Sequence, residues 1–153
     1  MNNLHRELAP ISAGAWAEIE EEASRTLKRH LAARRVVDVA GPKGLAFSGV
    51  GTGHVRLIEA PAEGVRSVLR EVLPLVELRV PFTLSRQAID DVERGSEDSD
   101  WDPVKEAARR IAFAEDRAVF DGYAAAGIEG LRAASSNPVV KLPAHVEDYP
   151  EAV

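Results

Sequence analysis

The sequence predicts an α+β protein, in which helices and strands occupy separate stretches of the chain. Residues 12–33 place apolar side chains every three or four positions, which is typical of an amphipathic helix. Residues 76–84 alternate between apolar and polar side chains, which is typical of a half-buried strand. Residues 102–126 begin with a helix-start signal and continue as a second long helix. The order of these patterns favours an α+β architecture.

The first predicted helix covers residues 12–33 and presents a single apolar stripe. Ser12 is expected to cap its first turn, because a serine oxygen accepts a free backbone N–H there. Glutamates precede lysines and arginines along this helix, which stabilises it through the macrodipole. A basic docking face near the helix end is the second interpretation. The stripe consists of Trp16, Ile19, Ala23, Leu27 and Leu31.

Two short segments flank this helix. Leu4, Leu8 and Ile11 form an apolar lead-in, which we expect to dock within the subunit or on a neighbouring subunit. Val36–Val39 follows the helix and is a candidate strand, ended by a glycine–proline turn signal.

Residues 45–75 are predicted to form a flexible hairpin arm. Leu45–Phe47 and His54–Ile58 have strand character, but glycines at alternate positions from 49 to 53 separate them. Glycines at that spacing are unlike a packed core strand. The segment has few large apolar residues, so we expect it to need a partner surface.

The alternating segment Val76–Leu84 is the strongest strand candidate. Pro81 has no N–H group to donate, which places this strand at a sheet edge or at a bend. We expect an acidic, polar loop after it.

The second predicted helix begins with Asp102 as its N-cap and Pro103 in its first turn. Gly122 is a weak interior point and Gly127 is the expected end. A rod of about 24 residues would be roughly 36 Å long, and its many alanines suit a spine packed under a sheet. Its predicted buried face comprises Val104, Ala107, Ala108, Ile111, Ala114, Ala118 and Val119.

Residues 135–138 are predicted to form a loop, and Val139–Leu142 a short strand. No internal repeat interrupts this organisation.

Composition restricts the class of protein. The chain has 153 residues, enough for one core or for one and a half small lobes. Its net charge of −6 argues against a nucleic-acid partner, and no apolar run approaches the length of a membrane span. It has no cysteine, which excludes disulfides and thiolate metal sites. The amino-terminal stretch is unlike a secretory signal, so we expect a cytoplasmic protein.

Candidate metal and catalytic patterns are weak. Asp98, Asp100 and Asp102 resemble the start of a calcium loop, but proline replaces the turn glycine and arginine the closing glutamate. An acidic helix entry explains them better. The four histidines lack metal-ligand spacing, so we expect no metal and no cofactor. A small hydrolase built from Asp90, Asp91 and a histidine is the alternative function, which no spacing supports.

Glu115 and Asp116 are adjacent acids within the second predicted helix. Neighbouring positions do not share a helical face, so a carboxylate dyad is not expected. Ion pairs with Arg109, Arg110 or a neighbouring subunit are more plausible.

Several motifs together resemble one family. They are Met1–Leu4, Leu8–Pro10, Arg34–Asp38, Arg79–Gly95, Asp98–Ala108, Glu115–Asp116, Phe120–Gly122 and Gly127–Leu131. They resemble the encapsulins, or linocin-type bacteriocins, and the resemblance is closest to the actinobacterial branch. It covers essentially the whole chain.

The resemblance implies a structural role and the tailed-phage major capsid fold. Encapsulin shells are icosahedral, self-assemble from identical subunits, and enclose a cargo enzyme that carries a C-terminal targeting peptide. The implied cargo is a dye-decolourising peroxidase or a ferritin-like protein. The implied regions are a luminal helix (1–35), an extended hairpin arm with the first strand (36–75), a peripheral domain with a spine helix (76–142) and a linker (143–153).

The resemblance also implies a cargo-peptide groove between the first helix and the peripheral domain. An apolar stripe flanked by charges can receive an extended peptide with leucine-like anchors and a basic end. A purely structural role in the core is the equally weighted alternative for Leu27 and Leu31. The matching positions are Leu27, Leu31, Arg34, Val36, Asp38 and Leu75.

Two departures from the family pattern matter. Some encapsulins stack a flavin on an aromatic residue where this chain has Gln87, so no flavin is predicted. Family members also continue beyond the position of Val153 into an axial domain. We therefore expect an incomplete capsid fold: either the chain is a fragment, or a complementary C-terminal chain completes it.

Overall fold

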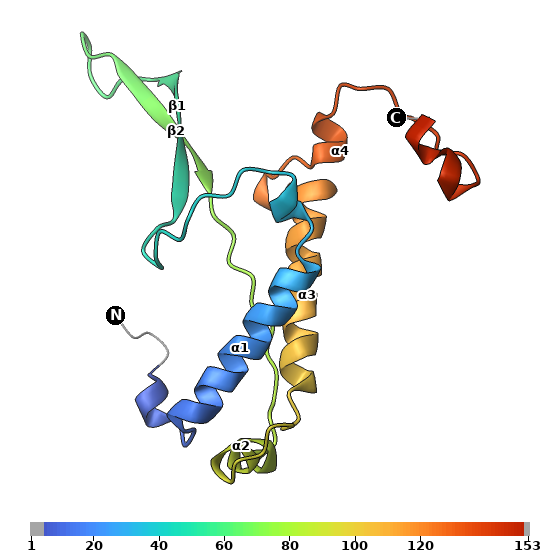
Figure 1. Ribbon diagram of the computed structural model, residues 1–153. Helices are drawn as coiled ribbons and strands as arrows, with labels where there is room; N and C mark the ends of the chain where they lie inside the picture. Colours follow the sequence, from blue (N-terminus) through green and yellow to red (C-terminus); the bar gives the residue numbers. More distant parts are fainter. Residues whose placement is uncertain (1–4, 152–153) are drawn as a thin grey trace.

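The computed structural model describes residues 5–151 of the chain. Two long helices, α1 (Ala13–His30) and α3 (Asp102–Phe120), lie side by side and form the body of the molecule (Figure 1). They run in the same direction, because contacts join start to start and end to end. A two-stranded hairpin makes the architecture mixed helix and strand, in agreement with the predicted α+β class.

Shorter elements connect and extend this body. They are η1 (Arg6–Leu8), η2 (Ala33–Arg35), β1 (Gly49–Ile58), β2 (Ser67–Pro74), α2 (Arg86–Glu93), η3 (Ala124–Ala126), α4 (Leu131–Ala134) and η4 (Val146–Glu151).

Helix α1 forms as its sequence pattern predicts, although it ends three residues early. The Ser12 hydroxyl accepts the backbone N–H of Ala15 at 3.1 Å, so the predicted cap is confirmed. The helix ends at His30 because Leu31 leaves the helical region of backbone space.

The segment before α1 contacts that helix through Arg6, which is not one of the apolar residues predicted to dock. Arg6 lies over the Trp16 ring, 4.7 Å from its centroid, and pairs with Glu20. Leu8 itself is exposed. Leu4 lies outside the described residues, as does Val153.

The core of the body lies between the first halves of α1 and α3. Its centre is Ile19, Trp101 and Val104, and Val104 is 2% exposed. Alanines 107, 108 and 112 of α3 are buried, which allows the two helix backbones to approach closely. The predicted buried face of α3 is therefore correct in its first half, whereas Ala114 is exposed.

Helix α3 differs from its prediction at both ends. It begins at Asp102 with Trp101 at the N-cap position, so the predicted Asp102 cap is wrong, and the Asp102 N–H donates to Asp100 Oδ1 at 3.0 Å. It ends at Phe120, because Gly122 adopts a φ of 89° and so acts as the terminating glycine in place of Gly127. With 19 residues, α3 is about 28 Å long. It packs against α1 rather than under a sheet.

Helix α2 was not predicted, since residues 86–93 were expected to form a polar loop. Its cap is clear in the structure: the Ser85 hydroxyl accepts the Ala88 N–H at 3.1 Å. Ala88 and Val92 face the body, and Val92 packs against the core. Eight residues are too short for the helical period to stand out among so many acids.

Several predicted strands are wrong. Val76–Leu84 is extended but carries no ladder, and Val36–Val39, Leu45–Phe47 and Val139–Leu142 are turns or coil. Alternating or β-branched sequences form strands only where a neighbouring strand accepts their hydrogen bonds. Within residues 5–151, β1 and β2 make the one sheet present.

The predicted hairpin arm is confirmed as an antiparallel pair. Strand β1 includes the glycines that were expected to interrupt it, and the register shifts between Gly51 and Val55. Gly53 sits in this irregular stretch with a φ of 80°, which favours glycine. The Thr52 hydroxyl donates to the Glu71 carbonyl at 3.2 Å across the shift. The hairpin projects away from the helical body (Figure 1).

In the part of the chain from residue 5 to residue 151, none of the helices combines the length and the apolar character that crossing a membrane requires.

Candidate functional site

The structure separates the six predicted docking residues into three groups. Arg34 and Asp38 line a common concavity, whereas Val36 and Leu75 are exposed outside it. Leu31 is buried at the end of α1, and Leu27 is half-buried one turn earlier. The burial of Leu31 is what a core role requires, so its side chain is not free to receive a ligand without rearrangement.

The concavity that holds Arg34 and Asp38 lies between the segment after α1 and the second half of α3. Its volume is about 520 Å³. Its wall is mainly apolar, with one cation and two acids. The lining residues are Ala33, Arg34, Val37, Asp38, Val39, Ala40, Pro42, Glu115 and Val119. Such a surface can accept an apolar side chain that has a charged group beside it.

Arg34 is held in this concavity by a bidentate pair with Glu115. Its Nε donates to Glu115 Oε1 at 2.6 Å and its Nη2 donates to Oε2 at 2.8 Å. The hydrogen bond from Glu115 raises the pKa of the Arg34 guanidinium above its ordinary value. The planar match of guanidinium and carboxylate fixes the direction of both side chains. The expected partners of Glu115, Arg109 and Arg110, bond to Glu106 instead.

Asp116 holds the backbone of the same segment. Its carboxylate accepts the N–H groups of Ala32 and Ala33 at 2.8–3.1 Å. Ala32 is the N-cap of η2 and Ala33 is its first residue, so the main chain offers these two N–H groups no helical acceptor. The adjacent acids therefore serve different partners, as the absence of a shared helical face predicts.

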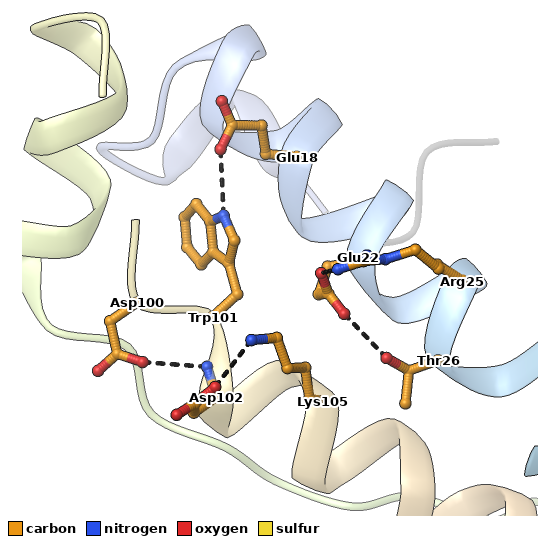
Figure 2. A network of polar contacts seen from close by, with 8 residues as sticks. All are labelled: Glu18, Glu22, Arg25, Thr26, Asp100, Trp101, Asp102 and Lys105. Carbon is orange, nitrogen blue, oxygen red and sulfur yellow. Dashed lines mark hydrogen bonds and ion pairs between the residues drawn. The ribbon is translucent and has the colours of Figure 1, made fainter. Parts of the chain in front are cut away.

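A second, more polar cleft lies between the second half of α1 and the first half of α3 and has a volume of about 560 Å³. Figure 2 shows side chains that line it, such as Glu22, Thr26 and Lys105, together with Glu18 and Trp101 beside it. Trp101 Nε1 donates to Glu18 at 3.1 Å, and Lys105 Nζ donates to Asp102 at 2.8 Å. Each acid that lines this cleft is bonded to a donor of its own helix. The Trp101–Glu18 hydrogen bond beside the cleft joins the start of α3 to α1.

Glu22 is a buried carboxylate within this network. It accepts a hydrogen bond from the Thr26 hydroxyl at 2.9 Å and pairs with Arg25 (Figure 2). Burial opposes ionisation, but the hydrogen bonds from Arg25 and Thr26 and the charges of Arg25 and Lys105 outweigh it. The pKa of Glu22 is therefore lowered.

The acidic loop before α3 uses its carboxylates locally. Asp98 accepts a hydrogen bond from the Ser96 hydroxyl at 2.8 Å, and Asp100 accepts one from the first N–H of α3. This arrangement is the acidic helix entry that the sequence favours over a calcium loop. Across residues 5–151, no group of three or more histidines and acids is placed to hold a metal ion.

The residues of the alternative hydrolase site bond within their own helix. Asp90 lies 3.5 Å from Arg86, and Asp91 pairs with Arg94. Gln87, at the position where a flavin-stacking aromatic would stand, lies in the first turn of α2.

Glu115 and Asp116 are the residues whose partners sequence reasoning missed. They are more than 80 positions away from Arg34 and Ala32. No local spacing rule connects residues that far apart. The available signal was chemical: two acids in a helix that also lies near a basic segment require cationic or N–H partners.

Comparisons with known proteins agree with the resemblance. The family model described as "encapsulating protein for peroxidase" matches residues 1–153. The chain is 65% identical over 153 residues to a type 1 encapsulin shell protein of Rhodococcus erythropolis. It is 61% identical to that of Mycolicibacterium paratuberculosis and 60% identical to that of Mycobacterium tuberculosis.

Each of these alignments covers 100% of this chain but 58% of the relative. The chain thus spans somewhat more than half the length of the curated relatives it matches. Since the match to the family model extends over all 153 residues, the chain belongs to the linocin family of encapsulating proteins.

Proposed function

We propose that this chain belongs to a shell subunit of an encapsulin nanocompartment, a self-assembling icosahedral cage in the bacterial cytoplasm. Family membership and the names of the three relatives support this proposal. In it, the subunit is structural and has no catalytic role, and the enclosed guest performs the chemistry.

The proposed fold is that of the tailed-phage major capsid proteins. Residues 1–35 would form the luminal helix and residues 36–75 the extended arm. Residues 76–142 would form the peripheral domain around the spine helix α3, and residues 143–153 a linker toward an axial domain. The parallel packing of α1 on α3 is compatible with this division.

The observation that carries the proposal is the exposure of the hairpin arm. Its strands pair with each other, yet apolar side chains remain in solvent on both faces: Leu57 is 68% exposed on one face and Leu73 is 57% exposed on the other. A two-stranded hairpin has little stability alone, and an exposed strand edge invites pairing with another chain. Neighbouring subunits of a shell would cover this arm, and each subunit would be held by several neighbours at once.

The proposed guest is a dye-decolourising peroxidase or a ferritin-like protein, and the family description names a peroxidase. Its C-terminal peptide would dock on the inner wall at Leu27, Leu31, Arg34, Val36, Asp38 and Leu75. The apolar concavity beside Arg34 and Asp38 supports this location.

Electron microscopy of the protein purified from its complete coding sequence tests the assembly. We expect closed particles of uniform diameter, and mass spectrometry of co-purified material should identify a guest enzyme. Monodisperse monomers at micromolar concentration would contradict the shell function. Peroxidase, ferroxidase or peptidase turnover by guest-free protein would contradict the purely structural role.

A second experiment tests the docking residues. The variant Leu27→Asp with Arg34→Glu is co-expressed with a peroxidase that carries its own C-terminal peptide. We expect intact but empty particles, because the anchor surface becomes acidic and polar. Wild-type particles with a peroxidase that lacks the peptide provide the matched empty control. Normal loading of the variant would eliminate the docking assignment.

A further inference from the structure

We propose that Glu115 and Asp116 are positioning residues that build the guest-docking surface from α3, and that Arg34 acts through Glu115 rather than by contacting the guest. This inference rests on the proposed guest docking. It changes the role of one predicted docking residue and adds two that the sequence did not indicate.

The first step concerns the segment after α1. Residues 36–42 form no helix or strand, and they provide most of the concavity wall. Nothing regular in the backbone fixes such a segment, so its position depends on side-chain anchors. Asp116 supplies one anchor by accepting the N–H groups of Ala32 and Ala33, and Ala33 is fully buried beside it.

The second step concerns Arg34. Its guanidinium uses Nε and Nη2 for the two carboxylate oxygens of Glu115. In this geometry, the Nε–Nη2 edge of the guanidinium is occupied by Glu115, so no second carboxylate can bind to that edge. An acidic group on a guest would find only the remaining N–H groups of a guanidinium whose charge Glu115 already balances, and a basic group would meet a pair that is neutral overall. Arg34 is thus better placed to fix the wall than to recognise charge.

The third step concerns the remaining charge of the concavity. Asp38 lines it and has no ion pair or hydrogen bond in the described part of the chain. With Arg34 and Glu115 matched, Asp38 leaves the concavity net negative. This charge favours a guest segment with an apolar side chain and a neighbouring cation.

Charge exchange between Arg34 and Glu115 tests the assignment. Arg34→Glu and Glu115→Gln are compared with the double variant Arg34→Glu with Glu115→Arg, each co-expressed with a limiting amount of the peroxidase that carries its peptide. We expect the guest-to-shell ratio to fall about two- to fivefold in each single variant, the range of an exposed ion pair. The double variant should recover most of the wild-type ratio, because the pair is restored in reverse.

Direct recognition by Arg34 predicts different results. Glu115→Gln would then leave loading unchanged or raise it, because Arg34 is released, and the double variant would stay empty. Either result would overturn the positioning role while leaving guest docking itself intact. Glu106→Gln is the matched control, since Glu106 bonds to arginines of its own helix. If no variant at position 34 or 115 alters loading while the peptide-free peroxidase stays outside, the positioning role of the Arg34–Glu115 pair is also wrong.

Hydrogen exchange provides a readout that does not depend on the guest. In empty particles, Asp116→Ala should accelerate exchange of the Ala32 and Ala33 amides, and loading should fall with it. Asp116→Asn should have a smaller effect, because the amide oxygen still accepts one bond. Unchanged exchange in Asp116→Ala would contradict the anchor, even in particles that assemble normally.

Discussion

In the helical body, the side chain of Val104 is 2% exposed and touches Ile19 and Trp101, whereas in the hairpin arm the side chain of Leu57 is 68% exposed. Both regions are regular secondary structure with apolar side chains. The body buries those side chains between two helices of the same chain. The arm pairs its backbone N–H and C=O groups between β1 and β2 but leaves its apolar side chains exposed to solvent. The difference shows which part of the chain holds its own fold and which part needs a neighbour.

The largest expected effect comes from shortening one apolar side chain in each of these two regions. Ile19→Ala should lower the free energy of unfolding by about 2–5 kcal/mol, because it leaves a cavity in the core. Leu57→Ala should change it by less than about 0.5 kcal/mol, as for other exposed positions, but should impair assembly. Denaturant unfolding followed by circular dichroism measures the first effect, and particle yield by electron microscopy measures the second. Equal destabilisation by both variants would refute the comparison.

Two glycine substitutions, one outside the hairpin arm and one within it, test the same difference. A Cβ on Gly130 would lie 2.3 Å from the Gly122 nitrogen and 2.4 Å from the Asp121 carbonyl carbon, so Gly130→Ala should cost about 1–3 kcal/mol through overpacking. A Cβ on Gly53 would meet nothing within 4 Å, but its φ of 80° should still cost about 1–2 kcal/mol, confined to the arm. Thermal melting should detect the Gly130 change. For Gly53→Ala, faster hydrogen exchange restricted to β1 and β2 is expected, and a global shift would be unexpected.

The buried carboxylate of Glu22 gives the body a pH dependence. Its folded-state pKa is lowered, so its stabilising contribution is complete above the unfolded value near 4.5 and is lost as the pH falls through the folded value. Glu22→Gln should cost about 1–2 kcal/mol at pH 7, and the difference from wild type should shrink below pH 4.5. Urea unfolding at pH 7, 5 and 3.5 measures this trend. Glu21→Gln, on the exposed side of α1, is the control for the loss of one negative charge from this helix.

The smallest expected effect concerns the cap of α2. Ser85→Ala removes the acceptor of the Ala88 N–H and should destabilise the body by about 1 kcal/mol. Ser85→Asp should retain stability, because aspartate also caps helices. A loss of stability in Ser85→Asp equal to that in Ser85→Ala would show that the hydroxyl does not act as a cap.

The sequence by itself determined the elements that depend on local physics. Helix α1 with its Ser12 cap, the start of α3 within one residue and the hairpin arm all follow from periodicity, capping chemistry and glycine content. The family also follows from the sequence, because its motifs run along the whole chain.

Tertiary structure alone decided where strands form and which residues meet. Val76–Leu84 alternates as a strand does, but no described segment lies beside it to complete a ladder. Arg34 and Glu115 lie 81 positions apart and meet only because α1 and α3 pack in parallel. Side-chain periods record the face that a residue presents, whereas the identity of the neighbour on that face depends on how distant segments pack.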